Sequence, residues 1–163
     1  MSDIGVVPVG FNTIVQEEYA ATGKVPSGAR SFISKPKFEF YRSPEDGTIQ
    51  SLSGTGLLAS KVLYHFFMPR GSYALDTTKG SYIESLIGMN YDKPTLSVEI
   101  ARTIQKVEDD IKTSSEYIYS KNTDEELESI SLQNIEFNDR GQVLISVSIK
   151  AQSGKIASIQ VEV

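Results

Sequence analysis

His65 is the chain's single histidine and the first side chain that could carry acid–base or metal chemistry. The chain has no cysteine and no second histidine, so neither a zinc site nor a thiolate nucleophile is expected. A catalytic triad would need an activated serine, and no serine stands in a Gly-x-Ser-x-Gly elbow. We therefore interpret His65 as a hydrogen-bonded or half-exposed helix residue. We predict no cofactor, no metal and no catalytic residue.

Two runs of acidic residues could supply paired carboxylates. Glu108, Asp109 and Asp110 are consecutive within an expected helix, and a second run occupies positions 124–126. Glycoside hydrolysis uses two carboxylates held roughly 5 to 9 Å apart across a cleft. Consecutive helix residues do not face one another, however. A solvated acidic face is the simpler interpretation, and a contact with a basic partner is the alternative.

Residues 76–80 read DTTKG and contain the residue types of a phosphate-binding loop. In such a loop the glycine comes before the lysine, and a strand leads into the loop. Here Lys79 precedes Gly80, and a helix is expected before the segment. We therefore interpret the stretch as a connector and not as a nucleotide site.

Composition narrows the class of protein. The chain has 163 residues, enough for one domain with an attached arm, and its net charge of −5 disfavours binding to nucleic acid. No apolar run approaches the length of a membrane span, and the first residues do not resemble a cleaved signal. We expect no membrane partner.

Three segments show the apolar spacing of amphipathic helices: residues 57–67, 81–87 and 95–119. Pro69 and Gly71 are expected to end the first helix, and Ser81 to cap the second. The connector between these two helices is expected to cross the neighbouring layer in extended form.

After residue 126 the apolar period changes to two, which is typical of strands. Ile130 and Leu132 alternate in one phase and Ile135 and Phe137 in the other, so we predict a bulge at 133–134. Two further alternating strands follow, separated by glycine-containing turns: residues 143–151 and 157–163.

These elements predict an α+β fold in which helices pack on a C-terminal three-stranded antiparallel meander. Residues 1–37 lack periodicity and are rich in proline and glycine, so we predict an extended N-terminal arm. Residues 38–163 form the predicted single domain, with a hairpin possible around the turn-rich segment 41–48.

The last predicted strand is the most informative feature for function. If it lies at an edge of the sheet, its outer backbone groups can pair with a strand from another protein. The alternative is an edge covered by the chain itself, for example by residues 38–50. For the open edge we predict an interface with this set of residues: Ile156, Ala157, Ile159, Val161 and Val163.

The order of elements resembles that of baseplate wedge proteins that initiate the sheath in contractile phage tails, a family found in T-even phages and contractile injection systems. The resemblance covers about residues 55–163. The matching positions lie in a turn, an extended segment, a short helix and the end of a long helix: Arg70, Gly71, Ser72, Asp76, Gly80, residues 83–88, Glu108 and Ile111. Asp109 and Asp110 depart from the family pattern, which has Pro-Arg after the glutamate.

The resemblance implies a structural virion protein, not an enzyme, that templates sheath assembly by adding strands to its sheet. Its partners would be the tail sheath protein, other baseplate wedge subunits, and tube or hub proteins. It would be present in multiple copies in the tail baseplate after assembly in the host cytoplasm. Arg70 and Glu108 would contact other baseplate chains. A lysozyme-like, glycan-cleaving baseplate enzyme and an unrelated small adaptor are the alternatives.

Overall fold

The computed structural model describes residues 3–4, 6–8, 16–19, 31–32, 38–40, 49, 51–73, 76–86, 89, 91–113, 122–137 and 143–162. The elements in these ranges follow in this order: β1 (Asp3–Ile4), β2 (Val6–Pro8), β3 (Gln16–Tyr19), β4 (Ser31–Phe32), β5 (Phe38–Phe40), β6 (Ser51–Leu52), α1 (Gly54–Phe67), α2 (Ile83–Leu86), α3 (Lys93–Lys112), β7 (Leu127–Phe137), β8 (Val143–Ala151) and β9 (Lys155–Glu162).

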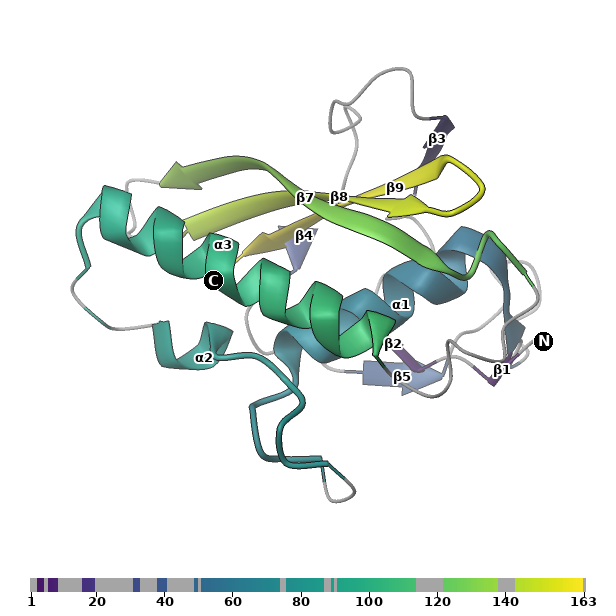
Figure 1. The fold of residues 1–163 in the computed structure, drawn as a ribbon, viewed down its shortest axis with the longest axis horizontal. Coiled ribbons are helices and arrows are strands. Elements are labelled where there is room, and N and C mark those ends of the chain that lie inside the picture. The colour runs from purple at the N-terminus through teal and green to yellow at the C-terminus, as the bar shows by residue number, and fades with distance from the viewer. Residues whose placement is uncertain are drawn as a thin grey trace.

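The predicted α+β fold is confirmed. Strands β7, β8 and β9 form an antiparallel meander, and the helices α1 and α3 lie together under one face of it (Figure 1). The larger sheet runs in the order β3-β9-β8-β7, with β4 also pairing with β9. Two small antiparallel pairs, β1 with β6 and β2 with β5, complete the described strands.

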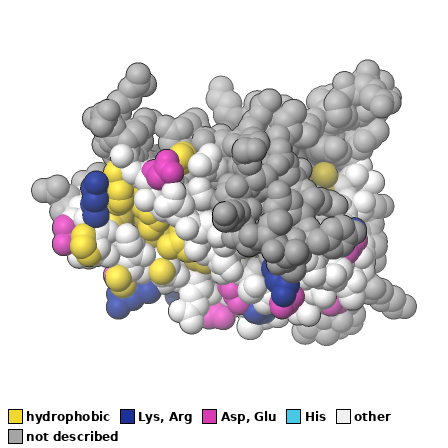
Figure 2. All heavy atoms as spheres, turned by 90° about the horizontal axis from the view of Figure 1, so that it is seen from above, with side chains coloured by type: hydrophobic (Ala, Val, Ile, Leu, Met, Phe, Trp, Pro, Cys, Tyr) yellow, Lys and Arg dark blue, Asp and Glu magenta, His cyan; other side chains and the backbone are white. Residues whose placement is uncertain are grey.

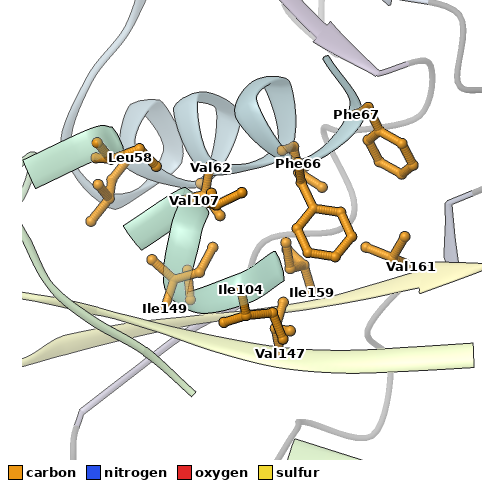
Figure 3. Close-up of a cluster of buried hydrophobic side chains, with 14 of the residues drawn as sticks. Leu58, Val62, Phe66, Phe67, Ile104, Val107, Val147, Ile149, Ile159 and Val161 are labelled. Carbon is orange, nitrogen blue, oxygen red and sulfur yellow. The ribbon is translucent and has the colours of Figure 1, made fainter. Parts of the chain in front are cut away.

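The core lies between the helices and the meander. In Figure 3, Val62 and Phe66 of α1 lie on one side of this layer, and Val147 and Ile159 of the sheet on the other. Each of these four side chains is buried. Because apolar burial is the main favourable term in folding, this layer fixes how the helices sit on the sheet.

The helices begin and end at other residues than the periodicity indicates. Helix α1 starts three residues before position 57, and α3 covers Lys93–Lys112 instead of residues 95–119. Asp92 caps α3 by accepting a hydrogen bond from the Thr95 amide, and Thr113 ends it. The long helix was therefore over-predicted at its end, and residues 114–120 lie outside the described ranges. None of the described helices is long and apolar enough to cross a membrane.

The strand predictions hold closely. The register between β7 and β8 shifts between Leu132 and Asn134, which confirms the predicted bulge, and it shifts again between Leu127 and Ser129. At the β8–β9 turn, Gly154 has a φ of +86° and donates its amide to the Ala151 carbonyl. The turn expected at 138–141 lies outside the described residues.

Strands β1–β4 all come from the predicted arm. Strand β5 pairs with β2. The short hairpin considered around 41–48 lies outside the described residues. Pairing of this kind connects the start of the chain to the domain through backbone hydrogen bonds.

Candidate functional site: the edges of the sheet

Strand β9 carries the predicted interface, and its residues alternate between two faces. Ala157, Ile159 and Val161 are buried on the face toward the helices, and Figure 3 places Val161 near Phe67 of α1. Ile156 is buried as well. These side chains belong to the core, so only the backbone edge of β9 is available as a site. Val163 lies outside the described residues.

Of the two alternatives for the β9 edge, the structure shows the covered one. Strand β3 pairs antiparallel with β9 from Gln16↔Ser158 to Tyr19↔Lys155. Strand β4 pairs parallel with it at Ser31↔Gln160 and Phe32↔Val161. The cover comes from the first 32 residues, and β5, the described strand within the segment 38–50 considered for it, pairs with β2 instead. The physical reason is that an edge strand's unpaired amides and carbonyls gain hydrogen bonds from any extended segment nearby.

The opposite edge of the sheet, β7, is protected in another way. Among the described strands β7 pairs only with β8, but Glu108 of α3 reaches it. Its Oε2 accepts a hydrogen bond from the Ile130 amide at 2.8 Å, and its Oε1 pairs with Lys112 at 2.5 Å. Together with the two bulges, this side-chain contact makes β7 a poor template for a further strand.

Hydrophobic side chains nevertheless gather beside β7. Figure 2 shows a hydrophobic band at one end of this surface, with charged side chains at its margins. Four half-buried residues of β7 pack against the core: Ile130, Leu132, Ile135 and Phe137. Lys93 lies over the Phe137 ring, 4.8 Å from its centre. These four side chains of β7 are thus continuous with the core.

Arg70, the other predicted contact residue, lies in a closed loop. Its exposed guanidinium sits over the Tyr82 ring, 5.0 Å from the centre. The Ser81 amide donates to the Met68 carbonyl at 2.9 Å, and the Arg70 amide donates to the Ser81 carbonyl at 3.0 Å. The two ends of the connector are therefore joined, and the expectation that its middle crosses a layer in extended form is wrong. Figure 1 shows this segment projecting away from the body.

The polar residues of the connector are engaged in its turns. Asp76 accepts hydrogen bonds from the amide and the hydroxyl of Thr78, and these bonds lower the pKa of the Asp76 carboxyl. Lys79 lies over the Tyr73 ring. Ser81 accepts a hydrogen bond from the Ile83 amide, the first of α2, at 3.2 Å, although the residue directly before the helix is Tyr82. The residues that resemble a phosphate loop thus stabilise a folded connector.

Glu125 was missed as a site residue because the acidic runs were interpreted as solvated. Its carboxylate is buried and accepts hydrogen bonds from the Gly54 amide at 3.1 Å and from Asn122 Nδ2 at 3.0 Å. It therefore caps α1, whose N-cap residue Ser53 forms no side-chain cap. Asp110 is buried too and pairs with Lys106. The interpretation as a solvated face is wrong for both residues.

His65 is half-buried on α1, with the Tyr64 ring edge-on to it. Within the described ranges, no group of three or more His, Asp or Glu residues could hold a metal ion. Comparison with protein-family models, with curated proteins and with solved structures found no match. Function must therefore be argued from the geometry of the chain itself.

Proposed function

We propose that this chain is a structural component of a contractile tail baseplate that templates sheath assembly by β-strand addition. Its partners are the tail sheath protein, wedge subunits, and tube or hub proteins. It belongs in the virion, in multiple copies around the baseplate, after assembly in the host cytoplasm. The resemblance over residues 55–163 supports this function, and it rests on the order of elements.

The observation that carries the proposal is the behaviour of the β9 edge. It pairs with segments more than 120 residues away in the chain, in antiparallel direction through β3 and in parallel direction through β4. An edge that accepts distant extended segments in both directions has the backbone geometry that strand addition needs. A sheath arm would use the same amides and carbonyls.

Glu108 favours this structural role over a glycan-cleaving one. Both of its carboxylate oxygens are engaged, one by the Ile130 amide and one by Lys112. A general acid needs access to the glycosidic oxygen of its substrate. Glu108 is therefore assigned to stabilising the β7 edge, and Arg70 remains the candidate for contact with another baseplate chain.

The test is sheath nucleation. Purified sheath subunits are followed by light scattering with and without a small amount of this chain, and the product is viewed by electron microscopy with the chain gold-labelled. We expect a shortened lag and label at one end of each sheath. Deleting residues 157–163 is unsuitable, because Ala157, Ile159 and Val161 are core residues. An unchanged lag, with label absent from sheath ends, contradicts the proposal.

A further inference from the structure

We infer that β3 and β4 are an exchangeable cover, and that the β9 edge beneath them binds an extended antiparallel segment of another protein. The guest spans β9 from Lys155 to Val161 and carries apolar residues opposite Ala157, Ile159 and Val161. That the natural guest is a sheath arm rests on the function proposed above. The exchange itself rests on the register of β9.

The cover is short and divided. Strand β3 pairs four residues of β9 and β4 pairs two, whereas β8 pairs seven residues on the other side. The two covering strands also run in opposite directions, so they cannot form one ladder. A single guest strand along the same edge would form a continuous ladder, and fewer separate segments would have to be ordered.

The cover also matches the sheet poorly at one position. A row is the set of residues directly opposite one another across the strands. Glu17 of β3 stands in the row of Ala157, Ile149 and Ile130, which is otherwise apolar. An acidic residue gains little in such a row, because a carboxylate keeps its hydration only by staying in water. A valine or isoleucine at that position would fit better.

The register leaves a break between the two covering strands. Ile159 has no partner in either β3 or β4, although its row continues through Val147 and Leu132. By contrast, the register places Phe32 of β4, an apolar residue, opposite Val161, whose row continues through Ile145. A continuous guest strand would also pair with Ile159. It could then place apolar residues opposite all three of Ala157, Ile159 and Val161.

A disulfide staple can hold the cover in place. Gln16 and Ser158 are directly opposite in an antiparallel pair, where Cα atoms are about 4.5 to 5.5 Å apart, within the range that a disulfide spans. Ser158 is fully buried and its hydroxyl has no hydrogen-bond partner among the described residues, so cysteine is a conservative replacement. The chain has no native cysteine, so the double variant Gln16→Cys/Ser158→Cys can form only this bond within one chain.

The probe is a fluorescent synthetic peptide in which valine and threonine alternate, with lysine at both ends. Its affinity for the full-length double variant is measured by fluorescence anisotropy under oxidising and reducing conditions. We expect binding in the reduced form and at least a tenfold loss of affinity when the staple is closed. Ser158→Cys alone is the control and should show no redox dependence. Failure of the staple to form, absence of binding in the reduced form, or equal binding in both forms overturns the inference.

A second variant tests the mismatched row without a disulfide. Glu17→Val should strengthen the pairing of β3 with β9. Because β3 then competes better with the peptide, peptide binding should weaken several-fold. Glu18→Val removes the same charge one residue along, opposite Ile156 in a row that contains Lys150 and Ser129, and should change binding much less. If both variants weaken peptide binding equally, the loss of one negative charge explains the result. That outcome would contradict the assigned register.

The two proposals fail in different ways. If the staple blocks peptide binding but the reduced chain does not shorten the sheath lag, the exchange stands and the function as a sheath template fails. If the chain shortens the lag equally with the staple open and closed, the function stands and the exchange fails.

Discussion

At the scale of single residues, helix α1 is capped by Glu125, which is distant in the sequence, and not by the neighbouring Ser53. Glu125 lies 71 positions along the chain from Gly54, whose amide donates a hydrogen bond to it. Positions 53–55 contain serine, glycine and threonine, which favour a local cap, yet Ser53 does not form one. A buried carboxylate at a helix N-terminus is stabilised by the free amides and by the helix dipole. The spacing of residues in the sequence does not predict this hydrogen bond.

We expect Glu125→Ala to lower the free energy of unfolding by about 2 kcal/mol, because it leaves the Gly54 amide without its acceptor in a buried site. Glu125→Gln keeps an acceptor oxygen but loses the charge, and should cost about 1 kcal/mol. Urea denaturation measures both. If the two variants match the wild type, the carboxylate does not stabilise the helix.

Gly80 is the residue that closes the connector. Its φ is +97°, and a Cβ there would lie 2.6 Å from the Met68 carbonyl oxygen and 2.9 Å from that of Pro69. Gly80→Ala should therefore cost on the order of 3 kcal/mol. Gly71 has a similar φ of +84° but no close neighbour, so Gly71→Ala should cost about 1 kcal/mol. Equal melting temperatures for the two variants would contradict the closed loop.

Asp124 links the turn before β7 to β9 through Lys155 Nζ at 2.8 Å. This bond and the Ser153 hydroxyl lower the pKa of the Asp124 carboxyl. A carboxyl with a lower pKa in the folded state stabilises the fold above its unfolded pKa, about 3.9, and loses this effect as the pH falls through the folded pKa. Asp124→Asn should therefore flatten the pH dependence of unfolding below about pH 4. Asp109→Asn, at an exposed position, is the control, and an equal flattening there would contradict the assignment.

At the scale of elements, local pattern predicted the meander and the β7 bulge, because alternation records which face of a strand is buried. The end of α3 was placed too late because Ile111 and Ile118, seven residues apart, were counted as one stripe. The structure ends the helix at Lys112, and Thr113 donates its hydroxyl to the Asp109 carbonyl. The pairing of β9 with β3 and β4 could not be predicted, because strand pairing across 120 residues leaves no local period.

The Glu108 contact makes a prediction about strand β7. Glu108→Ala should leave the Ile130 amide exposed to solvent or to another chain, lower stability by about 1 kcal/mol and speed hydrogen exchange at Ile130. Asp109→Ala removes an exposed acid one position along α3 and should leave that amide unchanged. Unchanged exchange in the Glu108 variant would show that the carboxylate does not protect this edge.

At the scale of the whole molecule, strands β3 and β4 from the start of the chain pair with the last strand, β9. In the function that we propose, these two strands determine whether a foreign strand can reach the sheet. The sequence pointed to β9 as the site through its alternation and its place at the end of the meander. It could not reveal the cover, since residues 16–19 and 31–32 carry no strand period of their own.

The most direct test of the central claim is a cryo-electron microscopy reconstruction of the junction between baseplate and sheath at a resolution that traces the backbone. Our account predicts a continuous antiparallel strand from the sheath protein along β9, opposite Ala157, Ile159 and Val161, with β3 and β4 displaced. A junction in which β3 and β4 still cover β9 and the sheath binds elsewhere would contradict it.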